Sequence, residues 1–511
     1  MKERRHFFFE KKKQKTFICC PSLGTSTGRS EWPETDKSFL VLFFKKERPS
    51  FYCLALLASL SACEVGPNYH RPTAEAPAAF KEQAGWKPAQ PLDAQPRGAW
   101  WAVLNDPVLD GLERHVAISN QNVRAAEAAY RAAAALTDEA RAGLFPTVGV
   151  TPAVSRSKGG GGNTLFSPSA RTSYSLEGTA SWDPDVWGKI RRQIEAQSAA
   201  AQVSQADLAN AELSAQASLA TDYIALRYQD SLTALLRDTV KAYTASLRIT
   251  SNQFAAGTVS RADVVIAEAQ LQTAQSQLIA AGVARATMEH AIAVLAGMPP
   301  AALTVQPALL GTYVPVPPTG LPSTLLERRP DIAAAERTAA EQSANIGVAV
   351  AAYYPEISLS AAFGYAGDPL SKLFTVANQA WSLGASASET VFDAGARGAA
   401  VRAARANYDE AVATYRQTVL TAFQQVEDQL STLRILQDQA VAADAAVEST
   451  RHAVEVTLNE YRAGTQAYTA VVTEQTALLG NQEAALAIRE SRLTAAVSLI
   501  TALGGGWEAH K

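Results

Sequence analysis

The sequence predicts a mainly helical chain that holds two copies of one unit, with a small β part in each copy. Two stretches, 189–253 and 399–462, run for more than sixty residues without proline or glycine, so each is expected to be one very long helix. Four shorter segments alternate apolar and polar residues, which is typical of strands. Several short motifs recur at an offset close to 208 residues, which indicates an internal duplication.

The composition excludes several classes of function. A net charge of −3 over 511 residues gives no sign of a basic patch, so no nucleic-acid partner is expected. All four cysteines lie within the first 63 residues, which excludes a disulfide framework in the rest of the chain. No pair of histidines has the spacing of metal ligands, and no P-loop or G-x-S-x-G motif occurs. We therefore expect no enzyme, no metal and no cofactor, and energy for any transport must come from partners.

The N-terminal part of the chain has the features of an export signal. Over 45–62, basic residues precede a short apolar run and then small residues, as in a secretory signal peptide. The apolar run is shorter than the roughly 20 residues that span a bilayer as a helix. Leu60-Ser61-Ala62-Cys63 matches the bacterial lipobox, so by that resemblance Cys63 is acylated and becomes the first residue of an outer-membrane lipoprotein. The alternative is a chance match inside a buried segment.

Residues 1–44 do not fit this signal and are expected to be a non-native or mis-annotated extension. The two copies of the repeated unit are expected at 112–298 and 325–505, joined by a proline-rich linker at 299–324. The matching pairs are Phe145-Pro146 with Tyr354-Pro355, Asp183 with Asp393, 254–258 with 461–465, and 295–299 with 503–507. A tail covers 506–511.

Four segments are predicted to be strands, two in each copy. They lie near 147–155, 172–182, 356–365 and 381–391. Alternation over about ten residues, with aromatic residues near the ends, is typical of a transmembrane β-strand. A half-buried strand of a soluble sheet has the same pattern, and the export signal favours the membrane. Because lipid does not tolerate open sheet edges, four strands need further chains to close a barrel.

The long helices exceed the size of a compact domain. At 1.5 Å per residue each spans about 95 Å, which favours a coiled coil or the wall of a tube. An apolar stripe that includes Leu208, Leu219, Tyr223 and Leu226 predicts packing against other helices and not a ligand site.

Six motifs resemble those of the outer-membrane efflux porins of the TolC/OprM type, including the NodT-like outer-membrane factor lipoproteins. The motifs are Val65-Gly-Pro-Asn-Tyr-His-Arg-Pro72, Trp100-Trp101 with Asp106-Pro107, Trp182-Asp-Pro-Asp-Val-Trp-Gly188, Arg328-Arg329-Pro330-Asp331-Ile332, Val391-Phe-Asp-Ala-Gly395, and Leu503-Gly-Gly-Gly-Trp507. Together with the duplication, the resemblance covers 63–508.

The resemblance implies a homotrimer with a twelve-stranded β-barrel and an α-barrel that crosses the periplasm. Residues 63–111 would form an anchor and an equatorial segment. The implied partners are outer-membrane lipid, a periplasmic adaptor (membrane fusion) protein and an inner-membrane pump of the resistance-nodulation-division type. The implied function is passive export of drugs or other small molecules through a lipid-anchored outer-membrane channel with a periplasmic extension.

The same resemblance places the two helical return turns at the periplasmic entrance. In familiar members a ring of aspartates narrows this entrance, whereas Ala470 and Thr473 stand at the matching positions here. We therefore predict a constriction that Thr469 and Thr473 line and that is less negative than usual. The predicted tip and gate residues are Gly257, Arg261, Asp263, Gly464, Tyr468, Thr469, Thr473 and Glu474.

Two alternatives are also compatible with the sequence. One keeps the fold and changes the cargo, which gives a type I secretion duct for proteins. The other is a periplasmic coiled-coil adaptor or scaffold lipoprotein without a membrane span. An adaptor would need a lipoyl-like β-domain between its helices, and not two separated hairpins of barrel type.

Overall fold

The computed structural model describes residues 64–74, 81, 98–158, 170–315 and 328–505. All described residues belong to one compact unit that lies within 60–511. The extension 1–44, the signal 45–62, Cys63 and the tail 506–511 therefore lie outside the described residues, and their assignments stay predictions.

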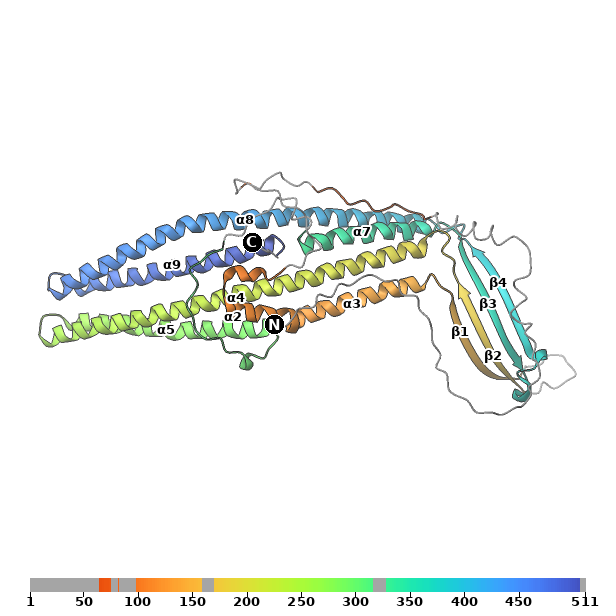
Figure 1. Ribbon diagram of the computed structural model, residues 1–511, viewed down its shortest axis with the longest axis horizontal. Coiled ribbons are helices and arrows are strands. Elements are labelled where there is room, and N and C mark those ends of the chain that lie inside the picture. The colour runs from red at the N-terminus through yellow and green to blue at the C-terminus, as the bar shows by residue number, and fades with distance from the viewer. Residues whose placement is uncertain (1–63, 75–80, 82–97, 159–169, 316–327, 506–511) are drawn as a thin grey trace, which may run out of the picture. The chain divides into compact units, whose positions relative to one another are not determined.

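Each copy of the unit has the same order of elements, as Figure 1 shows. A helix leads to two strands, a very long helix follows, and a shorter helix returns. The first copy holds α3 (Gln121–Ala142), β1 (Thr147–Ser157), β2 (Arg171–Trp182), α4 (Lys189–Ala255) and α5 (Arg261–Leu295). The second holds α7 (Pro330–Ala351), β3 (Glu356–Gly367), β4 (Gln379–Ser388), α8 (Ala396–Arg462) and α9 (Tyr468–Ala502). The short elements are η1 (Trp100–Leu104), α2 (Pro107–Ser119), η2 (Pro300–Ala302), η3 (Leu370–Lys372) and η4 (Val376–Asn378).

The lengths of the helices match between the copies. Both α4 and α8 have 67 residues, and both α5 and α9 have 35. At 1.5 Å per residue the long helices measure about 100 Å. The predicted fold class, mainly helical with a small β part and long antiparallel helices, is confirmed.

One pairing of the duplication is wrong. Asp393 corresponds to Asp185 and not to Asp183, because both carboxylates bind the first turn of the long helix that follows. The backbone N–H groups of Ile190 and Arg191 donate to Asp185, both at 2.9 Å. Those of Gly395 and Arg397 donate to Asp393 at 2.9 and 3.1 Å. The corrected offset, from 185 to 393, is 208 residues and agrees better with the other motifs.

The four strands form one antiparallel sheet in the order β1-β2-β3-β4. Its register places the predicted apolar faces of all four strands on one side. Val150, Gly178, Phe363 and Trp381 are consecutive partners across the sheet, and the next level down holds Val148, Ala180, Ala361 and Leu383. The opposite side carries mainly serine, threonine, glycine and alanine. One edge of β1 and one edge of β4 have no strand beside them among the described residues.

The prediction of a fourth strand to residue 391 was three residues too long. β4 ends at Ser388, and the chain turns away because Asp393 and Arg397 form an ion pair at 2.7 Å. The Arg397 guanidinium also donates to the carbonyl oxygen of Thr390. These contacts hold 390–397 as a tight entry into α8, so the backbone leaves the ladder early.

The helices form a layer in which α4 contacts α3, α5, α7 and α9, while α8 contacts α7 and α9. The main core lies where η1, α2 and the segment after α5 cover α4 and α9. It includes Trp100, Leu109, Leu219, Tyr223, Leu226 and Val497. The predicted apolar stripe on α4 is thus used for packing, although Leu208 at its start is only half-buried. Of the described helices, only α5 is long and apolar enough to span a bilayer, and length and composition alone are weak evidence for a span.

Glu113 on α2 is buried in this core without a partner. Its side chain is 0% exposed, and among the described residues neither carboxylate oxygen accepts a hydrogen bond. Burial raises the pKa of Glu113 to about 9, because an isolated charge is costly away from water. Glu113 is therefore protonated at neutral pH.

The raised pKa predicts that Glu113 makes stability depend on pH. Between about pH 4.5 and pH 9 the folded chain retains a proton that the unfolded chain releases, so stability falls as pH rises, by about 1.4 kcal/mol per unit at most. We expect Glu113→Gln to match the wild type near pH 5 and to be the more stable protein at pH 9. The midpoints of thermal unfolding at both pH values measure this difference in stability. Glu127→Gln, at an exposed site on α3, is the control, and equal slopes for Glu113→Gln and the wild type would contradict the prediction.

Candidate functional site

The sheet presents a large exposed apolar surface on one face. Val148, Val150, Trp381 and Leu383 are each at least 68% exposed, which is unusual for side chains of this size in a soluble domain. Aromatic rings gather towards the β3–β4 connection, where Tyr365 contacts Phe363 and Phe374 at ring distances of 5.7 and 5.4 Å. An apolar band with aromatic side chains near its end is the surface of a strand that faces lipid.

A second feature is the segment that directly follows the predicted lipidation site, residues 64–72, here named the anchor strap. The buried side chain of Arg192, near the start of α4, holds it. Arg192 donates to the carbonyl oxygen of Val65 at 3.2 Å and to the side chain of Asn68 at 2.8 Å. It also forms ion pairs with Glu64 at 3.4 Å and Glu195 at 2.6 Å.

Further contacts dock the anchor strap on α7 and on the β2–α4 connection. The hydroxyl of Tyr69 donates to Glu336 on α7 at 2.6 Å, and the N–H of Val65 donates to the carbonyl oxygen of Trp187 at 3.2 Å. Gly66 has a φ of +99°, and a Cβ there would lie 2.5 Å from the Cα of Gly347. The V-G-P motif thus needs glycine because the strap lies directly on α7.

At the other end of the long helices, the two copies make the same turn, here named the tip turns (256–260 and 463–467). Gly257 and Gly464 have φ values of +75° and +76°, as glycine permits after a helix. In each turn the following threonine donates through its N–H to a carbonyl oxygen five residues back, at 3.0 Å. Asp263 closes the first turn in a capping box with Ser260.

Among the other predicted tip residues, Tyr468 is buried, whereas Thr469 and Thr473 are exposed. Tyr468 is buried against Tyr461, at 5.2 Å between rings, and Tyr461 donates to Thr250 on α4 at 3.2 Å. Thr469 and Thr473 share an exposed face of α9, and the Thr473 hydroxyl donates to the Thr469 carbonyl oxygen at 3.0 Å. The remaining predicted residues lie nearby, with Arg261 over the ring of Phe254 and Glu474 half-buried.

A buried polar network between the two hairpins was not predicted from the sequence. Gln475 on α9 donates to Ser246 on α4 at 3.0 Å and accepts a hydrogen bond from Gln270 on α5 at 3.3 Å. Together with the contact of Tyr461 with Thr250, this network links the tips of the α4–α5 and α8–α9 hairpins. The signal in the sequence is slight, since it consists of polar residues at positions where the helical period expects apolar ones.

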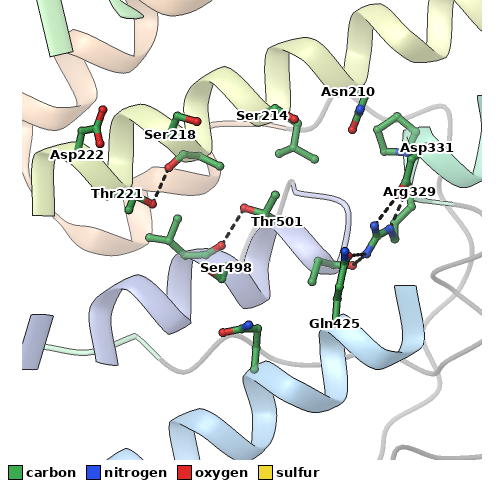
Figure 2. Close-up of a pocket in the computed structure, with 16 residues that line it drawn as sticks. Asn210, Ser214, Ser218, Thr221, Asp222, Arg329, Asp331, Gln425, Ser498 and Thr501 are labelled. Atoms are coloured by element: carbon green, nitrogen blue, oxygen red, sulfur yellow. Dashed lines mark hydrogen bonds and ion pairs between the residues drawn. The ribbon is translucent and has the colours of Figure 1, made fainter. Parts of the chain in front are cut away.

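A polar pocket of about 560 Å³ lies between α4, α8, α9 and the start of α7, as Figure 2 shows. Arg329 lies at one end of the pocket, and all three nitrogens of its guanidinium donate hydrogen bonds. It pairs with both oxygens of Asp331, at 3.0 and 2.6 Å, and donates to Gln425 and to the carbonyl oxygen of Ala502. The R-R-P-D-I motif therefore joins the start of the second copy to the end of α9 in the same copy. Burial raises the pKa of Asp222, which lines this pocket.

These features define a class of protein. A sheet with one lipid-facing side joins helices of about 100 Å that return at paired turns, which is the architecture of an outer-membrane channel protomer with a long extension. No group of three or more metal-ligating side chains lies together among the described residues.

Comparison with known proteins identifies the family. The family model described as "Outer membrane efflux protein" matches residues 114–298 and again 321–505. The toluene efflux pump outer membrane protein TtgC of Pseudomonas putida is 29% identical over 461 residues, covering 88% of this chain and 93% of that protein. The pyoverdine export outer membrane protein OpmQ of Pseudomonas aeruginosa is 30% identical over 429 residues, covering 82% and 90%. The solved outer-membrane channel OprN aligns with a TM-score of 0.80 at 30% identity, over 87% of this chain and 100% of that one.

The chain therefore belongs to the outer membrane efflux protein family, as the motifs predicted. It is an outer-membrane channel component of an efflux system, and its helices extend into the periplasm. The family favours this function over the adaptor alternative. The fold agrees, since the two hairpins form one sheet instead of a lipoyl-like domain between helices.

The contacts of Arg192 predict that it fixes the anchor strap. Hydrogen bonds to a charged group contribute about 1.5–3 kcal/mol, so Arg192→Ala should increase hydrogen exchange of the peptide 64–72 about tenfold or more. Exchange measured by mass spectrometry on the purified protein tests this. Arg191→Ala is the matched control, because Arg191 is the neighbouring arginine and pairs with Asp185. Exchange of 64–72 that stays at the wild-type rate in Arg192→Ala would contradict the role of Arg192.

Proposed function

We propose that three copies of the chain form one lipid-anchored duct, with a twelve-stranded β-barrel in the outer membrane and an α-barrel in the periplasm. The observation that carries this proposal is the sheet, whose apolar face is continuous while β1 and β4 each keep an edge that no other described residue pairs with. Unpaired backbone groups are too costly in lipid, so the edges of β1 and β4 must pair with other copies.

The helices support the same assembly. The return helix α5 exposes Val265, Ile279, Val283 and Val294, each at least 50% accessible in the single chain. Contact with the α8–α9 hairpin of a neighbouring copy would remove this apolar surface from water. The apparent suitability of α5 for a membrane span then has a simpler cause, which is burial between helices of a tube wall.

We place the anchor of the duct at Cys63. The anchor strap begins at the next residue, Glu64, and a Cβ added to Gly188 would lie 2.8 Å from the Glu64 side chain. Gly188 directly precedes α4, six residues after β2 ends, so the strap starts at the junction of sheet and helices. Acyl chains on Cys63 would enter the membrane beside the barrel without straining the chain.

We infer that the duct is passive and works with a periplasmic adaptor protein and an inner-membrane pump, of the resistance-nodulation-division type. Relatives are named for the efflux of toluene and antibiotics and for the export of pyoverdine, which are small molecules. This naming favours small-molecule cargo over secreted proteins. The tip turns would be the entrance that meets the partners, and Gly257, Arg261, Asp263, Gly464, Tyr468, Thr469, Thr473 and Glu474 would form the tip and gate.

The two faces of β4 predict that a change to arginine prevents assembly on one face and is tolerated on the other. Leu383 lies on the apolar face and Ser382, its neighbour, on the polar face. Arginine at the lipid-facing midplane of a barrel costs about 2–4 kcal/mol, so Leu383→Arg should strongly reduce assembled protein in the outer membrane. Ser382→Arg, the matched control, should assemble at the wild-type level. Heat-dissociable trimers on gels of outer-membrane fractions measure both, and normal assembly of Leu383→Arg would contradict the lipid-facing assignment.

The predicted constriction makes a second test. If Thr473 lines the tip, three added carboxylates in Thr473→Asp should increase the preference of the channel for cations over anions. Reversal potentials across planar bilayers measure the permeability ratio of K⁺ to Cl⁻. Thr473→Asn, of similar size and without charge, should leave the ratio unchanged. A ratio that Thr473→Asp does not alter would remove Thr473 from the pore.

A further inference from the structure

The polar face of the sheet carries very few charges. The sheet register assigns to this face a series of small or hydroxyl-bearing side chains, such as Thr151, Ser175, Thr179 and Ser382. Three charged residues share it. Arg171 lies at one end, Glu356 lies at the other, and Glu177 lies between them in the middle of β2.

Glu177 differs from the other carboxylate of this face. Glu356 is neutralised by Lys189, with 3.1 Å between the ammonium nitrogen and the carboxylate oxygen. Glu177 is exposed, and its carboxylate has no ion pair or hydrogen bond to another described residue. Arg171 is six residues away along an extended strand, which is about 20 Å. This distance exceeds the Debye length of about 8 Å at physiological salt, so Arg171 does not neutralise Glu177.

The neighbours of Glu177 leave it free to project from the sheet. Its direct partners are Thr151 on β1 and Gly364 on β3. A Cβ on Gly364 would lie 2.5 Å from the carbonyl oxygen of Leu176 and 2.9 Å from the Cα of Glu177, so no larger residue fits there without a shift. A hollow of about 190 Å³ lies at this level, and its lining includes Glu177, Gly364 and Ser382. The carboxylate thus stands among glycine and small side chains.

We propose that Glu177 determines the charge selectivity of the duct. This inference rests on the proposed trimer, in which the apolar face of the sheet meets lipid and the polar face lines the lumen. Three copies of Glu177 then form one ring of carboxylates inside the β-barrel. Rings of acidic side chains favour cations in channels, and low-dielectric walls concentrate their field. The ring favours cationic solutes over anionic ones, at a level far from the tip.

Reversal potentials across planar bilayers test the ring, with the purified full-length protein at about 0.1 M KCl. The wild type should pass K⁺ in preference to Cl⁻, and Glu177→Gln should reduce the permeability ratio at least about twofold. Glu177→Asp should retain the wild-type ratio. In 1 M KCl, where the Debye length is about 3 Å, the difference between the wild type and Glu177→Gln should shrink.

A relocated carboxylate separates a local charge effect from a structural one. Thr179 lies one position further along the same face of β2, so Thr179→Glu in the Glu177→Gln background should restore the cation preference. The matched control is the double variant Glu356→Gln, Lys189→Gln. It removes a neutralised pair at the end of the polar face and should leave the permeability ratio of K⁺ to Cl⁻ unchanged.

The outcomes distinguish this inference from the proposed duct. A conducting channel whose permeability ratio is the same in Glu177→Gln and in the wild type would overturn the carboxylate ring and leave the duct intact. A reconstituted wild-type protein that forms no trimer and no conducting channel would overturn the duct and the ring together.

Discussion

The structure depends on one constraint, which is that a backbone N–H or C=O group cannot remain unpaired in lipid. Within the described part of the chain, the sheet pairs these groups between β1 and β4 and leaves those at its two outer edges unpaired. Association of copies is therefore built into the β part before any side chain is considered. The alternation of apolar and polar residues then decides which face meets lipid and which face meets water. The same alternation places Glu177 on the polar face, away from other charges. The helices continue the sheet, because each long helix begins within eight residues of the end of a strand.

Hydrogen bonds at the junction of sheet and helices hold this arrangement in place. Asp185 and Asp393 bind the first amides of α4 and α8, and Arg192 holds the anchor strap beside the start of α4. At the far end, the tip turns repeat the same glycine geometry, and the Gln475 network joins the two hairpins. A duct needs both kinds of order. The membrane end must be fixed in register, and the periplasmic end must keep a defined shape for its partners.

Much of the fold could be predicted from the sequence, because it depends on local period. The absence of proline and glycine predicted both long helices, and alternation predicted which face of each strand is apolar. The duplication also followed from spacing, but the pairing of Asp183 with Asp393 was wrong. The role of Asp185 depends on hydrogen bonds to amides that spacing does not reveal. The end of β4 was misplaced for a similar reason, since Arg397 draws the chain out of the ladder.

The site was less predictable because its contacts join distant parts of the chain. Arg192 meets residues 64–68, and Gly66 lies on Gly347, which no local pattern indicates. The burial of Tyr468 between the hairpins likewise depends on tertiary packing.

The number of subunits tests the central claim most directly. Native mass spectrometry of the protein extracted from outer membranes should give three chains per particle, each with an acylated N-terminus. A particle that holds one chain would contradict the account.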